Sequence, residues 1–220
     1  REIVVHGPDS LYKGLVLHYT FDDGDGARTV HDESGQKNHA QAHGTTYVDA
    51  GKLAGARRVN GSSDFLQTSL LPASGGLQPL GPNFSFALWL KIPEKNVSFW
   101  DTVIACSAFR ISLTAEKTAR VSWRGRASRS SPLWDMYAAP SVPIGEWCHV
   151  AAVKDGNKIT MYINGANSHT GTVGKSGPVK TLQFGKDTLS GIGAADYFKG
   201  VMDDLFIYSR PLTAAEVERL

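Results

Sequence analysis

The segment between residues 120 and 137 is rich in arginine and aromatic side chains. Aromatic rings stack on the faces of sugar rings, and guanidinium groups form paired hydrogen bonds with carboxylate or sulfate oxygens. We therefore expect a glycan, an acidic one included, to contact Trp123, Arg124, Arg126, Trp134 and Tyr137. The alternative is a solvated basic loop whose tryptophans cover the core, and it stays open.

The spacing of the carboxylates argues against polysaccharide hydrolysis. Glycosidases need two carboxyl groups that flank one glycosidic bond. Four glutamates have no acidic partner two or four residues away on a predicted strand: Glu94, Glu116, Glu146 and Glu216. The seven histidines are scattered, without a recognisable nucleophile–histidine–acid set. The sequence therefore predicts a protein that is not an enzyme.

Composition sets the class of protein. The 220 residues are 41% hydrophobic and 20% charged, which suits a folded domain with a sizeable core. A net charge of +2 does not indicate nucleic-acid binding. No apolar run is long enough for a transmembrane helix, so we expect no transmembrane segment.

Two features bear on the compartment. Cys106 and Cys148 allow one disulfide or two buried thiols. Asn-x-Ser sequons begin at Asn60, Asn83 and Asn96 and are compatible with secretion. We expect an extracellular, cell-surface or periplasmic module that belongs to a larger protein.

Strand patterns dominate the chain. Leu15, Leu17, Tyr19 and Phe21 alternate with other residues at the period of a strand with one buried face. Further strands are expected near 53–60, 64–69, 83–92, 101–106, 109–114, 119–124, 147–153, 158–164, 180–185 and 197–208. The dipeptides Asp155-Gly156 and Asn164-Gly165 predict tight hairpin turns.

The last residues predict a short helix. Thr213 and Glu216 have capping-box spacing before a helix over 214–220. About a dozen strands and one terminal helix predict two packed antiparallel sheets. We expect residues 1–13 to be a linker or a loose first strand, and residues 14–220 to form a single domain.

Five motifs, in order along the chain, resemble one known family. They are Gly14-Leu-Val-Leu-His-Tyr-Thr-Phe-Asp22, Asp32-Glu-Ser-Gly-Gln-Lys-Asn-His-Ala40, Phe84-Ser-Phe-Ala-Leu-Trp-Leu-Lys91, Trp147-Cys-His-Val-Ala151 with Tyr162-Ile-Asn-Gly165, and Phe198 to Thr213. The chain resembles laminin G-like jelly-roll domains of the concanavalin A-like lectin/glucanase superfamily. This resemblance implies an all-β sandwich, and it says less about the ligand because the fold hosts many functions.

The resemblance also implies a structural calcium ion where the first and last strands meet. Asp22, Asn38 and Asp203 are the expected ligands, since calcium takes six to eight hard oxygens. Asp203 is expected to share a face with Val201 and Leu205, where a carboxylate needs a cation or hydrogen-bond donors. Whether Asp203 or Asp204 binds the ion stays open, as does a reading in which these aspartates cap turns.

Three functions remain at this point. The first is a non-catalytic carbohydrate-binding module with structural calcium. The second is a protein-interaction or spacer domain beside a catalytic domain. The third is a hydrolase or lyase: Tyr197-Phe198-Lys199-Gly200 is similar to an alginate-lyase strand, but the other motifs of that family are missing.

Overall fold

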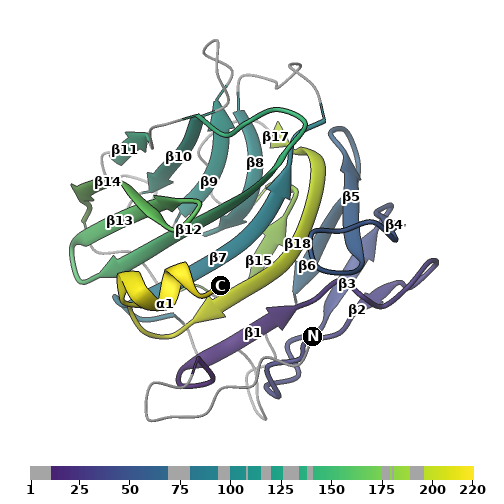
Figure 1. Ribbon diagram of the computed structural model, residues 1–220, viewed down its shortest axis with the longest axis horizontal. Coiled ribbons are helices and arrows are strands. Elements are labelled where there is room, and N and C mark those ends of the chain that lie inside the picture. The colour runs from purple at the N-terminus through teal and green to yellow at the C-terminus, as the bar shows by residue number, and fades with distance from the viewer. Residues whose placement is uncertain are drawn as a thin grey trace.

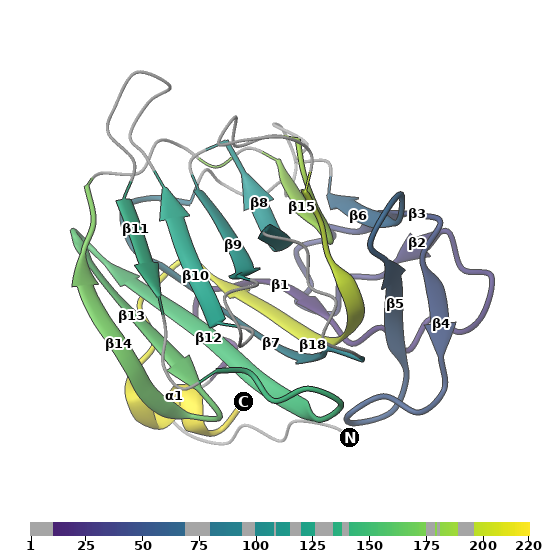
Figure 2. The ribbon, with the colours of Figure 1, turned by 90° about the horizontal axis from the view of Figure 1, so that it is seen from above.

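Two antiparallel sheets pack face to face and form a sandwich (Figures 1 and 2). The computed structural model describes residues 11–68, 80–93, 100–107, 109–114, 120–125, 134–137, 141–174, 179, 181–188 and 196–220. The predicted all-β class, the sandwich and the short C-terminal helix are confirmed. Most of the expected linker, residues 1–10, lies outside the described residues.

The first sheet contains the opening and closing strands of the chain. Its order is β14 (Ala166–Thr172), β13 (Lys158–Ile163), β12 (Trp147–Asp155), β7 (Phe84–Lys91), β18 (Lys199–Tyr208), β5 (Ala56–Asn60) and β4 (Thr46–Val48). Strand β1 (Leu15–Tyr19) pairs with the second half of β18, while β5 pairs with its first half. The first and last described strands therefore pair within one sheet.

The second sheet forms the opposite layer. Its order is β11 (Trp134–Tyr137), β10 (Arg120–Gly125), β9 (Phe109–Thr114), β8 (Trp100–Cys106), β15 (Leu182–Phe184), β6 (Phe65–Thr68), β3 (Ala40–His43) and β2 (Thr29–Val30). A small hairpin of β16 (Lys186–Asp187) and β17 (Asp196–Tyr197) forms a separate two-stranded sheet and packs against β8.

The main core fills the space between the sheets. Alternate residues of each strand point into it, so β9 contributes Phe109, Ile111 and Leu113 to one apolar cluster. Phe21 and Leu205 lie in this same cluster, as expected if the chain ends share one sandwich. Cys106 and Cys148 are both buried and form no disulfide, so they are thiols in this structure.

A second apolar cluster lies on the outer face of the first sheet. Helix α1 (Ala214–Glu218) covers the half of this face around the second half of β18, and its Val217 packs there beside Leu15, Phe206 and Tyr208. The predicted capping box is present, because the Thr213 hydroxyl accepts the Glu216 N–H and Glu216 bonds back to the Thr213 backbone. Within the described residues, no helix is both long and apolar enough to cross a membrane.

One prediction about β18 is wrong. Asp203 and Val201 share the outer face, but Leu205 points into the core on the other side. The pairing with β7 slips between Asp203 and Phe206, and Asp204 takes a positive φ of 41° there. This bulge shifts the alternation by one residue, so the outer face keeps Asp203 while the core gains Leu205.

Candidate functional site

Asp203, one of the predicted metal ligands, holds a loop made of residues 51–55. Its carboxylate accepts the backbone N–H groups of Lys52 at 2.7 Å and Leu53 at 3.0 Å, and the N–H of Asp204 at 2.8 Å. Burial raises the pKa of Asp203 to about 6, although the N–H groups of Leu53 and Lys52 favour the charged form. The donors that a buried carboxylate requires are therefore backbone groups.

Asp22 reaches the same loop from the end of β1. Its Oδ1 accepts the backbone N–H of Gly55 at 2.6 Å. Gly51 is needed for the close approach, since a Cβ at this position would lie 2.8 Å from Oδ2 of Asp203. Asp22 and Asp203 thus fix the 51–55 loop from two sides.

Asn38, the third predicted ligand, packs against β1 instead. Its side-chain amide donates to the Val16 carbonyl at 2.8 Å, and its backbone N–H donates to Asp32 at 2.8 Å. Among the described residues, no group of three or more His, Cys, Asp or Glu side chains could hold a metal ion. Both carboxylate oxygens of Asp203 and Oδ1 of Asp22 already accept N–H groups, and the calcium site stays a prediction.

The predicted ligand-binding residues lie on or near β10 and β11 of the second sheet. Trp123 is 1% exposed and stacks on Phe109 in the core at 4.2 Å between ring centroids, so its ring cannot meet a ligand. Arg124 is half-buried opposite Asp135 and Arg110. For Trp134 and Tyr137 the structure gives the strand position only: both belong to β11, opposite Gly125 and Ser122. Arg126 lies outside the described residues.

A buried ion pair lies on the outer side of the second sheet. Arg110 follows Phe109 on β9, points away from the core, and is 1% exposed. Its Nη1 lies 2.8 Å from Asp196 and 3.6 Å from Asp187, which are directly opposite each other in the β16–β17 hairpin. Burial raises the pKa of Asp196, and the charge of Arg110 opposes this shift. This carboxylate pair holds one guanidinium, which closes the hairpin onto the sheet.

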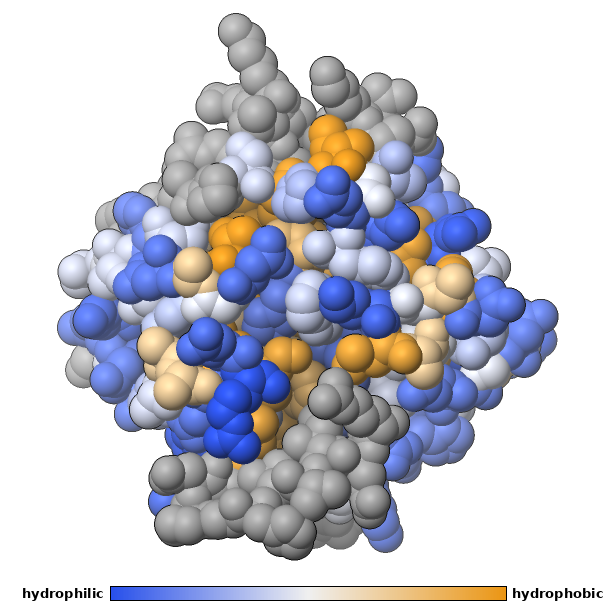
Figure 3. Space-filling view, in the orientation of Figure 1, coloured by the Kyte–Doolittle hydropathy of each residue, from blue (hydrophilic) through white to orange (hydrophobic). Residues whose placement is uncertain are grey.

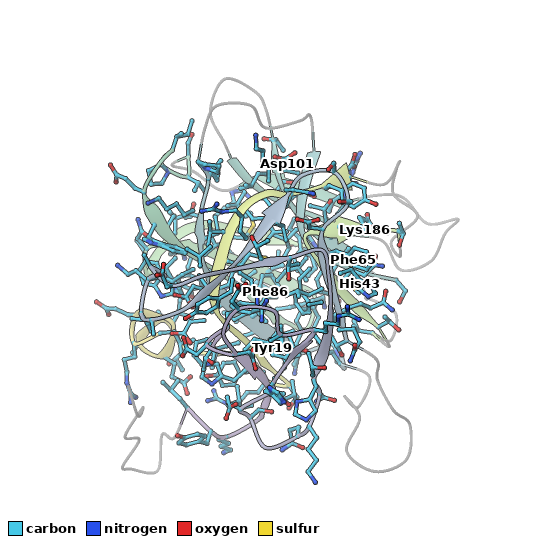
Figure 4. The ribbon with its side chains drawn as sticks, turned by 90° about the vertical axis from the view of Figure 1, so that its right-hand side faces the viewer. Tyr19, His43, Phe65, Phe86, Asp101 and Lys186 are labelled. Atoms are coloured by element: carbon cyan, nitrogen blue, oxygen red, sulfur yellow. The ribbon has the colours of Figure 1, made fainter. Side chains whose placement is uncertain are left out.

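An aromatic column lies beside this ion pair. The rings of His43 and Phe65 stack at 4.3 Å, and the Lys186 ammonium lies 4.1 Å from the centre of the Phe65 ring. Figure 4 shows His43, Phe65 and Lys186 together, at one side of the sandwich. The Phe65 ring is therefore occupied by contacts within the chain.

The outer face of the first sheet has a different character, because it contains an open pocket. The cavity has a volume of about 290 Å³ and lies beyond the half that α1 covers. We call it the basic pocket, and its lining residues are Val48, Ala50, Arg58, Val59, Lys91, Pro93, Trp147, Lys199, Gly200 and Val201. Figure 3 shows this face, where hydrophilic and apolar residues lie side by side in the upper half of the view.

Strand register places the charged groups of the basic pocket. Val201 of β18 is directly opposite Arg58 of β5 on one side and Lys91 of β7 on the other, and Lys91 is opposite Trp147 of β12. Directly opposed residues point to the same face, so these four side chains form one row across the sheet. Lys199 lies two residues before Val201 and therefore shares this face.

The pocket joins an aromatic ring to three positive charges. Trp147 is half-buried, Arg58 and Lys199 are exposed, and Lys91 is half-buried. Among the described residues that line the pocket, none is acidic. A ligand that has a ring with a carboxylate or a sulfate group would match both features, because the ring can stack on Trp147 and the anionic group can pair with the cations.

Sequence reasoning missed the basic pocket because its residues come from four separate strands. They are 33, 56 and 52 positions apart in order along the chain, from Arg58 to Lys91, Trp147 and Lys199. The available signal was the alternation of Lys91 and Lys199 with buried neighbours in confident strands. That signal assigns each residue to an outer face but not to a common row.

The comparisons with known proteins agree with this architecture. The family model described as "Concanavalin A-like lectin/glucanases superfamily", a laminin G-like model, matches residues 60–218. Among curated proteins, no sequence matches the chain.

Solved structures give further likenesses. Domain 4 of AbnA, a GH43 extracellular arabinanase from Geobacillus stearothermophilus, in complex with arabinotriose, is 25% identical with a TM-score of 0.70. The match covers 93% of this chain and 97% of that domain. The binding domain of Paraclostridial Mosquitocidal Protein 1 is 17% identical, with a TM-score of 0.71 over 94% of this chain and 51% of that one.

A third similar structure is the binding domain of botulinum neurotoxin DC in complex with rat synaptotagmin II. It is 14% identical with a TM-score of 0.72, and the match covers 96% of this chain and 51% of that one. This chain therefore spans about half the length of the two toxin domains, and their likeness concerns the fold.

Proposed function

The chain belongs to the concanavalin A-like lectin/glucanases superfamily, and we propose that it is a non-catalytic module that binds an acidic glycan in the basic pocket. The observation that carries this proposal is the convergence of Arg58, Lys91, Lys199 and Trp147 on one cavity. The tryptophan would stack on a sugar ring, and the cations would bind its carboxylate or sulfate.

The comparisons support a binding role. The arabinanase domain was solved with a neutral trisaccharide, and the toxin domains are described as binding domains. A glycan ligand at an outer face of the sandwich is consistent with these neighbours. The positive lining of the pocket is what directs our proposal toward an acidic glycan instead of a neutral one.

A non-catalytic role is supported by the positions of the carboxylates. Hydrolysis of a glycosidic bond requires a carboxyl pair that faces the sugar. Asp187 and Asp196 are close together, but both face Arg110. The described lining of the basic pocket contains no carboxyl group and no histidine that could transfer a proton.

We also retain two parts of the sequence-based prediction as proposals. One is an extracellular, cell-surface or periplasmic location, which the extracellular arabinanase neighbour supports. The other is a structural calcium ion bound by Asp22 and Asp203, with Asn38 contributing from the loop that precedes β3. If the ion binds, thermal unfolding of the wild type shifts upward with calcium and downward with EGTA, and Asp203→Ala removes that response.

The glycan proposal is tested by calorimetric titration with trigalacturonate, which carries a carboxylate on each ring, and with neutral arabinotriose. We expect trigalacturonate to bind, and to bind more weakly at high salt because ions screen the exposed charges. Trp147→Ala should weaken binding by about tenfold or more, as for other buried aromatic anchors. The matched control is Trp134→Ala, a tryptophan of β11 on the other sheet.

Two results would contradict the proposal. One is wild-type affinity for trigalacturonate in the Trp147→Ala variant. The other is the absence of saccharide binding to the wild type, with capture of a protein partner at the same face, which would favour the protein-interaction function instead.

A further inference from the structure

A second tryptophan lies next to the basic pocket on the same face. Trp89 and Lys91 are two residues apart on β7, so both point outward and are separated by about 7 Å along the strand. Trp147 is opposite Lys91, and His149 is opposite Trp89. The two indoles are thus diagonal neighbours, at about 7–8 Å between their backbones.

Lys52 covers the Trp89 ring. Its Nζ lies 4.3 Å from the ring centroid, and the residue itself is exposed. A cation–π contact at an exposed site is weak, so a ligand can displace the ammonium from the ring. The indole face carries no formal charge, so the ammonium keeps its capacity to bind an anion.

The backbone of Lys52 is held much more firmly than its side chain. Asp203 accepts its N–H at 2.7 Å, and the Gly51 N–H donates to the Ala54 carbonyl at 2.7 Å. Ala50, which comes just before this loop, is part of the wall of the basic pocket. The loop therefore holds a long cationic side chain over Trp89 from a fixed point that adjoins the wall of the pocket.

Other contacts hold the Trp89 ring in place. Its Nε1 donates to the Leu220 carbonyl at 3.4 Å, and the His149 ring lies 5.2 Å away at a tilt of 48°. Trp89 is half-buried by these neighbours. Movement of the Lys52 side chain would expose a ring that is already oriented.

We propose that Trp89 and Lys52 form a second subsite, so that the ligand is an acidic oligosaccharide of two or more rings rather than a single acidic sugar. This inference rests on the proposed function, in which the basic pocket binds the first ring. The second ring takes the place of the Lys52 side chain on Trp89. The displaced ammonium then pairs with the carboxylate or sulfate of that ring.

The test compares calorimetric affinities for galacturonate and trigalacturonate in the full chain. In the wild type we expect the trimer to bind about tenfold or more tightly than the monomer, since a stacked base or sugar ring commonly contributes at this level. Lys52→Gln and Trp89→Leu should reduce this preference to less than about threefold and leave the affinity for the monomer unchanged. Trp89→Phe, which keeps an aromatic face, should restore most of it.

Lys158→Gln is the matched control, because Lys158 is also an exposed lysine and lies on β13 of the first sheet, away from the basic pocket and Trp89. Thermal unfolding of each variant establishes that it is folded before titration. The subsite is refuted if Lys52→Gln and the folded Trp89 variants keep the wild-type preference for the trimer. Failure of the proposed function has a different signature, which is a wild type that binds neither saccharide or a Trp147→Ala variant with unchanged affinity for the monomer.

Discussion

Two groups of charged side chains lie on opposite outer faces of the sandwich. They differ in burial and in whether carboxylates are part of the group. In the first group, the Arg110 guanidinium lies beside the carboxylates of Asp187 and Asp196 and is almost completely buried. Around the basic pocket, Arg58, Lys91 and Lys199 line one open cavity, and none of its described lining residues is acidic. Buried charge that is paired with carboxylates holds the fold together, whereas charge that lines an open cavity is accessible to a ligand.

The largest expected effect is on stability, and it comes from breaking the ion pair of Arg110. Arg110→Leu leaves two carboxylates in a buried place without their cation, and we expect it to lower the free energy of unfolding by about 3–5 kcal/mol. Urea denaturation measures this loss. The matched change in the basic pocket, Arg58→Leu, should lower the free energy of unfolding by no more than about 0.5 kcal/mol. Equal losses in the two variants would remove the distinction between the two groups.

The next effect is on binding, and it comes from the basic pocket. Lys91→Gln keeps most of the side-chain volume but removes a charged donor from the pocket. We expect the affinity for trigalacturonate to fall by about tenfold to a hundredfold, which is the range for a hydrogen bond to a charged group. Titration calorimetry measures it, and the melting temperature should change little. Unchanged affinity would show that Lys91 does not face the ligand.

His149 offers a third comparison, because it is a titratable group kept neutral beneath the open face. Burial lowers its pKa to about 4, and the charge of Asp204 partly opposes this shift. The unfolded chain takes up a proton below about pH 6.5, whereas the folded chain does so only near pH 4, so stability falls as the pH decreases through this window. We expect a loss of about 1–3 kcal/mol between pH 7 and 4.

Denaturation curves at several pH values, for the wild type and His149→Gln, check this prediction. The variant should have a flatter profile from pH 6.5 to 4. A profile as steep as that of the wild type would assign the acid sensitivity to other groups.

The smallest effect concerns a compensated charge on the same face as the pocket. Arg210 forms an ion pair with Glu216 at 2.6 Å, and this hydrogen bond, with those from Thr213, lowers the pKa of Glu216 to about 2. Glu216→Gln should cost about 0.5–1 kcal/mol at pH 7, and Glu216→Ala about 1–2 kcal/mol, since only alanine also removes the capping box.

The contribution of the Glu216 charge is present above about pH 4.5 and disappears as the pH falls toward 2. The wild type and Glu216→Gln should therefore have converging stabilities in acid, as followed by thermal unfolding. A constant difference down to pH 2 would mean that the cap acts through its shape and not through its charge.

Much of the fold could be predicted because its determinants are local. Leu15, Leu17 and Tyr19 alternate on β1, and the capping box is a spacing of three residues. Asn164 and Gly165 both take the positive φ that the hairpin prediction requires. The other predicted turn lies one residue later than expected, at Gly156 and Asn157, because Asp155 still pairs with Lys158.

Other elements have no local determinant. Strand β14 reads Ala-Asn-Ser-His-Thr-Gly-Thr, a polar edge strand that needs no buried face and so shows no alternation. The bulge at Asp204 moves Leu205 from the expected outer face to the core face, and no residue type in this segment predicts a bulge.

The sites were harder to predict than the fold. Trp123 alternates in step with Val121, which is the signal that would have placed it in the core. The basic pocket depends on cross-strand register, and register is set by the whole sheet. Asp22 and Asp203 were predicted to converge, and they do so on one loop, because β1 and β18 bring their ends together.

The position of β18 has a consequence for how the protein is made. This strand lies inside the first sheet and pairs with β7 along one edge and with β5 and β1 along the other. During synthesis, β1, β5 and β7 leave the ribosome long before β18. Until β18 follows, the strand edges that pair with it have no partner. Long-range pairing of this kind folds slowly and exposes the nascent chain to aggregation. We therefore expect the domain to become protease-resistant only after residue 208 has left the ribosome, as a late and cooperative event.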